Sequence, residues 1–498
     1  MQLVGTPRID VLAFLVILLT PGISFGQNTS NQLTFSPTPS IFADLEDMPL
    51  VLRSAKAPST VSHNEALPYN YRPPQAPLDV KGYPLAPPEL QLEQVHVYVR
   101  HGERTPVGIR LAPFIPEHWV MCKTARQLRN PVLVNPNDLN GTLRIRRVVE
   151  RKDGTAMEGL CLLGELTDVG RKSTFNYGVA LRSLYIDRLG FLPDFLQKPG
   201  EVYFRSTNMP RTTQSLEQVI YGLYPTTKCN PSAAPTLLTR NGKDENLLGN
   251  TMSCKRLEYL QIGFAQAAAA AYNQTLEPLD KHVSKYLDGR PIRIDGKPRA
   301  SGVLDTIRAA VAHGVKVPSE FEDKTIVDVI EQAVVAEWFA GYKTHEVRRL
   351  GMGPLLADLS QKMQQKVERG AEDPLKILVH STHDTALAAM CSTLDVFDEK
   401  WPAFTSSITF ELFRRSQPVN QRSYLQAILS PFKSNAAPEY FVRMRYQNKN
   451  MPLPTCAAEG KHLAGSPEFC TLAAFRERVK ELTPVDWDTE CAPTGWIG

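Results

Sequence analysis

A histidine stands between two arginines at residues 100–104, where the chain reads Arg-His-Gly-Glu-Arg. The imidazole of His101 can act as a nucleophile, and the guanidinium groups of Arg100 and Arg104 are permanently charged planar donors that match the oxygens of a phosphate. Like charges this close repel each other unless an anion lies between them. The pattern therefore predicts an anion site that contains a histidine.

Two later segments carry side chains of the same kind. Arg205 follows the run Val-Tyr-Phe at 202–204, and His383 and Asp384 follow the run Ile-Leu-Val at 377–379. A carboxyl group such as Asp384 can donate a proton to a leaving group, and a cationic histidine such as His383 can donate hydrogen bonds to an anion. We expect six residues to form one site: Arg100, His101, Arg104, Arg205, His383 and Asp384.

All three segments are predicted to be buried β-strands. β-Branched valines alternate with other residues at 95–99, and Gly102 then allows a sharp turn. The segments 201–208 and 375–384 contain similar runs, and each is followed by a helical pattern, the first of them at 211–220. Such alternation is typical of an α/β domain, in which ligands bind at the carboxyl ends of the strands.

The middle of the chain has a different pattern. Strand signals become rare between about residues 229 and 370, where Ala267–Ala271 and a helical pattern at 326–350 indicate close helix packing. We expect residues 229–370 to form a helical cap or insertion domain inside an α/β domain made of residues 89–228 and 371–498. Substrate selectivity is expected to reside in this cap.

The N-terminal region has the pattern of a targeting signal. Residues 1–26 contain Arg8, the apolar run Val11–Leu19 and small residues up to Gly26, which is typical of a secretory signal peptide cleaved after Gly26. The run is short for a membrane span, and an uncleaved anchor is the alternative. Residues 27–88 are rich in Pro and Ser and predict an extended arm. We expect a secreted or extracellular protein without a stable membrane span, with the vacuole or lysosome as alternative destinations.

Cysteines and sequons agree with export. The eight cysteines show no metal-ligand spacing, so disulfides are expected and a metal site is not. Cys456 and Cys470 flank a short loop and are the favoured pair, while the other six cysteines allow fifteen pairings. Asn28, Asn140 and Asn273 each begin an N-x-S/T sequon and are predicted glycosylation sites.

The composition and net charge exclude few classes of protein, but they indicate a globular protein without a nucleic-acid partner. The 498 residues are 42% hydrophobic and 22% charged, as in an ordinary globular protein. A net charge of +4 is small for this length, so no nucleic-acid partner is expected. No cofactor is expected either, and the sequence does not determine the oligomeric state.

The motifs together resemble those of a known family. Arg100–Pro106 with the His-Asp pair at 383–384 resembles the histidine acid phosphatases of branch 2 of the histidine phosphatase superfamily, and 204–208 resembles the strand that supplies the family's third arginine. Segments 164–170 and 395–402 look most like lysophosphatidic acid phosphatases. The resemblance implies a three-layer αβα sandwich of the phosphoglycerate mutase-like type, with a mainly parallel central sheet and a mostly helical cap.

The same resemblance implies an acid phosphatase. His101 would form a phosphohistidine intermediate, Asp384 would donate the proton, and the arginines and His383 would bind the phosphate of a small phosphomonoester. Because Asp384 must be protonated, an acidic pH optimum is expected. Lysophosphatidic acid, phytate and sugar phosphates present the same phosphoryl group, so the sequence leaves the substrate open.

Two alternative functions remain. A phosphomutase-type enzyme would transfer the phosphoryl group within or between metabolites, and assaying the release of free phosphate separates it from a hydrolase. A catalytically silent anion-binding protein would bind phosphate without any turnover of p-nitrophenyl phosphate.

Overall fold

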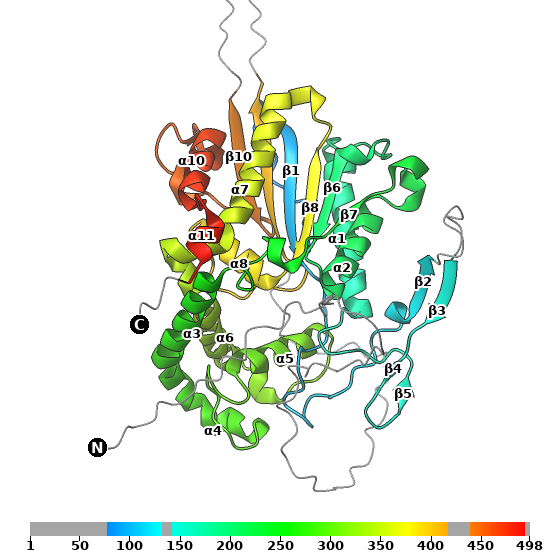
Figure 1. The fold of residues 1–498 in the computed structure, drawn as a ribbon, viewed down its shortest axis with the longest axis vertical. Helices are drawn as coiled ribbons and strands as arrows, with labels where there is room; N and C mark the ends of the chain where they lie inside the picture. The colour runs from blue at the N-terminus through cyan, green and yellow to red at the C-terminus, as the bar shows by residue number, and fades with distance from the viewer. Residues whose placement is uncertain (1–76, 132–141, 417–438, 494–498) are drawn as a thin grey trace, which may run out of the picture. The chain divides into compact units, whose positions relative to one another are not determined.

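A mixed β-sheet forms the centre of the chain in the computed structural model, which describes residues 77–131, 142–416 and 439–493 (Figure 1). In sheet order its strands are β12 (His462–Leu463), β13 (Ser466–Thr471), β10 (Tyr440–Tyr446), β9 (Ser407–Arg415), β1 (Leu90–Arg100), β8 (Ile377–Thr382), β6 (Val202–Ser206) and β7 (Leu237–Leu238), with β11 (Lys449–Asn450) paired to β10. Strands β1, β8, β6 and β7 are parallel, whereas β9, β10, β13 and β12 pair antiparallel. The predicted α/β class is confirmed, and its parallel part contains the three strands predicted from the sequence.

Two helices cover one face of this sheet. Helices α1 (Asp168–Arg182) and α2 (Pro210–Leu223) share a buried apolar cluster with Val97 of β1 and Val379 of β8. Because side chains alternate along a strand, the odd-numbered valines of β1 all point to this face.

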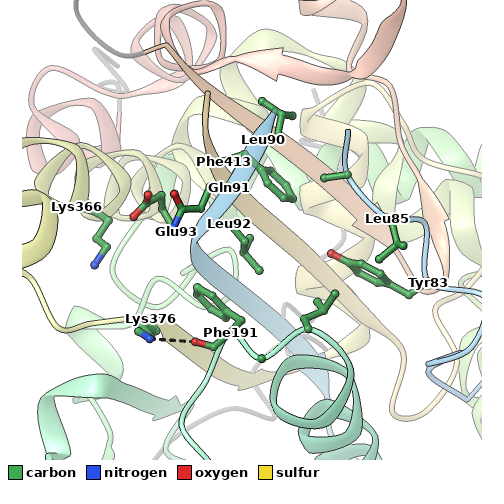
Figure 2. Close-up of a pocket in the computed structure, with 13 residues that line it drawn as sticks. Tyr83, Leu85, Leu90, Gln91, Leu92, Glu93, Phe191, Lys366, Lys376 and Phe413 are labelled. Atoms are coloured by element: carbon green, nitrogen blue, oxygen red, sulfur yellow. Dashed lines mark hydrogen bonds between the residues drawn. The ribbon is translucent and has the colours of Figure 1, made fainter. Parts of the chain in front are cut away.

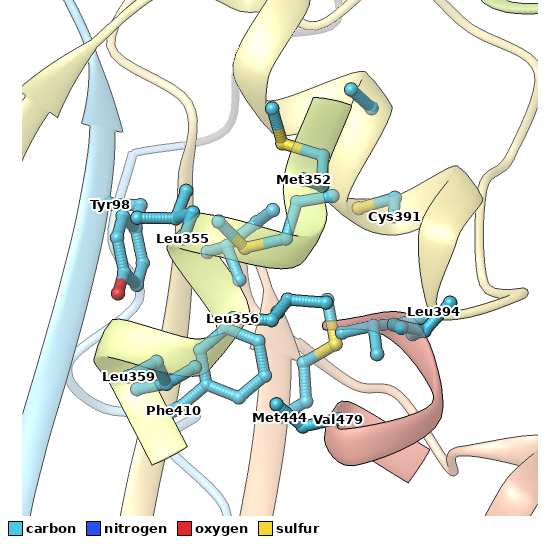
Figure 3. Close-up of a cluster of buried hydrophobic side chains, with 14 of the residues drawn as sticks. Tyr98, Met352, Leu355, Leu356, Leu359, Cys391, Leu394, Phe410, Met444 and Val479 are labelled. Atoms are coloured by element: carbon cyan, nitrogen blue, oxygen red, sulfur yellow. The ribbon is translucent and has the colours of Figure 1, made fainter. Parts of the chain in front are cut away.

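The opposite face carries another helical layer. Helices α7 (His345–Arg369), α8 (Asp384–Thr393) and α10 (Leu472–Leu482) pack there around Tyr98 and Phe410 (Figure 3). The sheet and its two helical layers form the predicted three-layer αβα arrangement.

The helical middle of the chain is divided between two cores. Helices α3 (Lys255–Leu276), α4 (Asp280–Val283), α5 (Ala300–Ala312) and α6 (Lys324–Phe339) share a separate core with Trp119. Helix α7 packs on the sheet instead. The predicted cap at 229–370 thus includes one helix that belongs to the sheet layers by its packing.

The helix predicted at 326–350 is interrupted. Helix α6 ends at Phe339, and a short 3-10 turn at Ala340–Lys343 separates it from α7. A Cβ atom at Gly341 would lie 3.0 Å from the ring of Phe264, and Thr344 is extended. Tertiary packing therefore overrides the continuous helical periodicity.

The structure contains three disulfides: Cys122–Cys161, Cys254–Cys491 and Cys456–Cys470. The last is the pair favoured from the sequence. Cys229 and Cys391 are free thiols, so the even number of cysteines does not correspond to complete pairing. The remaining described strands and α-helix are β2 (Gln127–Pro131), β3 (Thr142–Arg146), β4 (Val149–Glu150), β5 (Ala156–Met157) and α11 (Trp487–Cys491).

The described end of the N-terminal arm lies along the sheet. The hydroxyl of Tyr83 donates to Oε1 of Glu411 over 2.8 Å, and Nη1 of Arg443 donates to the carbonyl of Pro84 over 2.7 Å. The predicted signal peptide at 1–26 and the rest of the arm lie outside the described residues. Within the described ranges, none of the helices has the length and apolar character needed to cross a membrane.

Only one predicted glycosylation site falls within the described residues. Asn273 lies in α3, where its side-chain amide donates to Oδ1 of Asp295 over 2.8 Å. A glycan on this nitrogen would disturb that hydrogen bond. Asn28 and Asn140 lie outside the described residues, so all three sites stay predictions.

Candidate active site

The first and third predicted strand ends lie at one edge of the sheet. Strand β1 pairs with β8 so that Arg100 lies opposite Thr382, and β8 also pairs with β6. The backbone N–H of His101 donates to the carbonyl of Thr382 over 3.0 Å. The rings of His101 and His383 consequently lie with their centroids 5.6 Å apart.

A hydrogen bond of His101 determines which of its ring nitrogens carries the proton and which keeps a lone pair. Its Nδ1 lies 2.8 Å from the carbonyl oxygen of Gly102, and a carbonyl only accepts hydrogen bonds. Nδ1 therefore carries the proton, which leaves a lone pair on Nε2. Burial, followed by the charges of the neighbouring arginines, holds the pKa of His101 well below its usual value. The side chain is thus neutral, as a nucleophile must be.

Gly102 is required for close packing against α1. A Cβ atom at Gly102 would lie 2.3 Å from the carbonyl oxygen of Gly170, and one at Gly170 would lie 2.1 Å from the carbonyl oxygen of Glu103. Gly102 does not have a positive φ, so the close contact with α1, and not a left-handed backbone conformation, is what requires glycine here. Thr167 caps α1 by accepting from the backbone N–H of Gly170.

Asp384 opens α8 and lies against Arg100. Its Oδ2 is 2.6 Å from Nη2 of Arg100 and accepts from the indole Nε1 of Trp401 over 3.0 Å, while its Oδ1 accepts from the backbone N–H of Thr385 over 2.8 Å. Burial raises the pKa of Asp384, but the charges of Arg100 and Arg104 outweigh it, so the pKa lies below its usual value. A nearby phosphate would act in the opposite direction.

The two arginines of the first motif flank one aromatic ring. The guanidinium carbon of Arg100 lies 4.0 Å from the ring centroid of Phe404, and that of Arg104 lies 5.8 Å from it. Nη2 of Arg104 donates to Oδ1 of Asp305 over 2.8 Å, and burial lowers the pKa of Arg100 to about 10. The buried Nε atoms of both arginines have no hydrogen-bond partner among the described residues. Such N–H groups are suited to an anionic acceptor.

Arg205 has other partners than the predicted anion. Its Nη2 donates to Oδ1 of Asn246 over 2.8 Å and forms a buried salt bridge with Glu245. Arg205 lies level with His380 of β8, two residues before that strand ends at Thr382, which is about 7 Å along the strand. A buried carboxylate therefore pairs with the charge of Arg205, and the expected role of Arg205 in binding the anion stays a prediction.

Arg211 is the site residue that the sequence analysis did not identify. It lies in the first turn of α2, and its charge acts on both His101 and Asp384. Burial, followed by repulsion from Arg104, lowers the pKa of Arg211 to about 9. Its Nε has no hydrogen-bond partner among the described residues. One signal was available, since the first turn of α2 has a basic residue and no acidic one, against the preference of the helix dipole.

His383 adjoins His101 but is not the expected cation. Its Nε2 lies 3.0 Å from Oγ1 of Thr207. Burial, followed by the charge of Arg211, lowers the pKa of His383 to about 3. A neutral imidazole still has one N–H to donate, so His383 can contribute a hydrogen bond without contributing charge.

A cavity of about 490 Å³ lies at the other end of β1 (Figure 2). It is lined by Leu92, Phe191 and Lys376, whose Nζ donates to the carbonyl of Phe191 over 3.0 Å. Leu92 and Arg100 are separated by roughly 25 Å of extended strand. This cavity is therefore separate from the site at His101.

Comparisons with known proteins point to one family. Residues 91–447 match the sequence model of the family described as "Histidine phosphatase superfamily (branch 2)". The chain is 36% identical over 444 residues to a probable acid phosphatase of Schizosaccharomyces pombe, covering 82% of this chain and 95% of that protein. It is 26% identical over 414 residues to lysophosphatidic acid phosphatase type 6 of Homo sapiens, covering 81% and 87% of the two chains.

A solved structure supports the fold. The apo form of Hafnia alvei phytase superposes with a TM-score of 0.51 and 16% sequence identity, covering 82% of this chain and 99% of that one. At this identity the likeness is evidence for the shared fold alone.

Proposed function

The chain belongs to branch 2 of the histidine phosphatase superfamily and is a phosphomonoester hydrolase, and we propose that His101 is its nucleophile and Asp384 its proton donor. One observation carries this proposal: a neutral imidazole with its lone pair on Nε2 lies among guanidinium groups whose Nε atoms have no described partner. In place of Arg205, Arg211 completes the phosphate-binding group with Arg100, Arg104 and His383.

In the first step, Nε2 of His101 attacks the phosphorus in line with the ester oxygen. A P–N bond forms, the P–O bond to the leaving group breaks, and the proton of Asp384 moves to the departing oxygen. The arginines stabilise the charge on the equatorial phosphate oxygens. The bound phosphate raises the pKa of Asp384, which makes the protonated form accessible in acidic solution.

In the second step, water attacks the phosphorus of the phosphohistidine. Asp384, now ionised, takes the proton from the water, the P–N bond breaks and inorganic phosphate is released. His101 returns to its neutral form. Net release of phosphate separates this reaction from that of a phosphomutase.

The decisive experiment uses Asp384→Asn with two leaving groups. The variant cannot donate the proton, so kcat for an alkyl phosphate should fall at least about a hundredfold, while kcat for p-nitrophenyl phosphate, whose leaving group needs little protonation, should fall less than about tenfold. Equal slowing for both substrates would contradict the assignment. Acid-labile phosphate bound to protein after rapid quenching should disappear in His101→Ala.

We also propose that the substrate has an apolar leaving group, as lysophosphatidic acid does, in preference to phytate. Val107 is 40% exposed, and Leu162 and Leu163 are each 53% exposed. A Cβ atom at Gly164, the next residue, would lie 3.5 Å from Val107 and 3.8 Å from Nη1 of Arg211. An apolar chain would cover these side chains, whereas the further phosphates of phytate would require further cations. The human relative is named for this lipid class.

A substrate panel tests this preference. Leu163→Ser should raise KM for monomeric lysophosphatidate roughly tenfold and leave KM for glycerol phosphate unchanged. Leu85→Ser is the matched control, since Leu85 is 64% exposed and lines the distant cavity of Figure 2. A higher kcat/KM for phytate than for lysophosphatidate in the unmodified protein would reject the preference.

We propose that the protein enters the secretory pathway. The three disulfides fit an oxidising, extracellular environment. Sequencing the N-terminus of the secreted protein tests cleavage after Gly26, and a mobility shift after deglycosylation tests the three sequons. Retention of an intact N-terminus in a reducing compartment would contradict the proposal.

A further inference from the structure

Trp401 makes a hydrogen bond that the reaction described above does not use. Its indole Nε1 donates to Oδ2 of Asp384 over 3.0 Å, and Nη2 of Arg100 reaches the same oxygen at 2.6 Å. Indole and guanidinium groups can only donate, so both hold Oδ2 as an acceptor. A proton taken up by Asp384 is therefore directed to Oδ1, where the backbone N–H of Thr385 occupies one lone pair and leaves the other.

The peptide group of Trp401 is itself held by the helical part of the chain. Its backbone N–H donates to Oε1 of Glu331 in α6 over 2.6 Å, and its carbonyl accepts from Nη1 of Arg308 in α5 over 3.2 Å. Arg308 and Glu331 also form a salt bridge of 2.7 Å with each other. The indole packs against the rings of Trp338 and Phe339, with centroids 5.8 Å and 5.2 Å away.

We propose that Trp401 is a positioning residue that orients the carboxyl group of Asp384, and that Arg308 and Glu331 hold Trp401 in place. The inference rests on the proposed role of Asp384 as proton donor. It gives helices α5 and α6 a part in the chemistry, because they help to hold the proton donor through Trp401.

The effect on protonation has a defined sign. The charged and titratable groups that face Asp384 are Arg100, Arg104, Arg211 and His383. These remain in a Trp401→Phe variant, which loses the indole N–H and keeps an aromatic, though smaller, ring. Since that N–H favours the ionised carboxylate, its loss raises the pKa of Asp384 and moves the alkaline limb of the pH–rate profile to higher pH.

The test compares Trp401→Phe with Trp338→Phe, which removes a neighbouring indole. For an alkyl phosphate, Trp401→Phe should lower kcat about tenfold and shift the alkaline limb upward, with KM little changed. For p-nitrophenyl phosphate the loss should be below about threefold. Trp338→Phe should leave the ratio of the two rates and the limb unchanged.

A second variant keeps the proposal testable if Trp401→Phe does not fold. Glu331→Gln retains an acceptor for the Trp401 N–H but loses the ion pair with Arg308, and should show the same pattern at smaller size. The positioning role would be overturned if a variant with normal thermal unfolding hydrolysed both substrates more slowly by the same factor and kept the alkaline limb of its pH–rate profile at the same pH. Failure of the proposed function itself would appear differently, as unchanged hydrolysis in His101→Ala.

Discussion

Buried arginines lie in two places, Arg443 on β10 and Arg100, Arg104 and Arg211 around the end of β1 and the start of α2, and the two places differ in how the arginine charge is balanced. Arg443 on β10 forms a fully buried salt bridge of 2.7 Å with Glu411 on β9. The hydroxyls of Tyr83 and Tyr185 each donate to the same carboxylate over 2.8 Å. The charge of Arg443 is therefore neutralised within the protein, and the cluster joins the arm, the sheet and a covering helix.

The charges of the arginines around His101 are balanced less completely. Arg100 pairs with Asp384 and Arg104 with Asp305, whereas Arg211 lies beside them with its pKa lowered by burial and by a neighbouring arginine. The same residue type can thus stabilise the fold where a buried carboxylate neutralises it, and is suited to binding an anion where positive charge is left over.

The largest expected effect is on activity, in His101→Ala. Removing the nucleophile should lower kcat for p-nitrophenyl phosphate by about ten-thousandfold or more, since no phosphohistidine can form. The matched change is Glu411→Gln in the cluster of Arg443, Glu411, Tyr83 and Tyr185, called here the balanced cluster. This variant should keep kcat within about twofold and should instead be less stable to urea, because Arg443 loses its buried counter-charge. Residual activity above about one per cent in His101→Ala would contradict the role of His101 as nucleophile, and with it the functional difference between the two clusters.

The second-largest expected effect is a loss of stability in Arg205→Met. Glu245 would be left buried without its cation, so the free energy of unfolding should fall by about 3–5 kcal/mol. KM for p-nitrophenyl phosphate in the folded protein should change less than about threefold. The double variant Arg205→Met with Glu245→Leu should recover much of the stability. A stable Arg205→Met protein with weakened phosphate binding would restore the original assignment of Arg205.

The contrast between Arg205 and Arg211 shows what the sequence can predict. The runs that became β1, β6 and β8 were recognisable from their apolar, β-branched residues, and so were the groups that follow β1 and β8. The position of Arg205 depends on the register of β6 against β8 and on a glutamate about forty residues later, neither of which a local pattern contains.

Other features were equally non-local. The approach of Gly102 to Gly170 and the contact of Trp401 with Asp384 join segments that are distant in the sequence. The antiparallel strands β9, β10, β13 and β12 also lie far from the Arg100–Arg104 motif in the sequence. Local periodicity identifies an element, but the partner across the fold decides which of its side chains enter the site.

A smaller effect on catalysis is expected for Arg211→Ala. Loss of one charged donor to the transferring phosphoryl group should lower kcat/KM about a hundredfold. Stability should change by less than about 1 kcal/mol, because the variant leaves no buried carboxylate unpaired. Arg211→Lys should recover part of the activity, since it restores the charge without the planar fork. If Arg211→Ala instead kept the kcat/KM of the unmodified protein and lost stability, Arg211 would stabilise the fold as Arg443 does and would not bind phosphate.

The smallest effect concerns pH, and its sign differs between stability and activity. The pKa of Asp384 is lowered in the folded protein, so its ion pair with Arg100 contributes stability above the unfolded pKa of about 3.9 and loses it as the pH falls through the folded value. Asp384→Asn should therefore unfold with less dependence on pH in this acidic range.

Activity follows the protonated form of the same carboxyl group. With an alkyl phosphate, kcat should be highest in acidic solution and should fall with a limiting slope of about tenfold per pH unit on the alkaline side, as the donor loses its proton. The profile of Glu411→Gln should coincide with that of the unmodified protein, because the balanced cluster exchanges no proton with the substrate. A maximum above neutrality would exclude Asp384 as the donor and leave His101 without a partner for the leaving group.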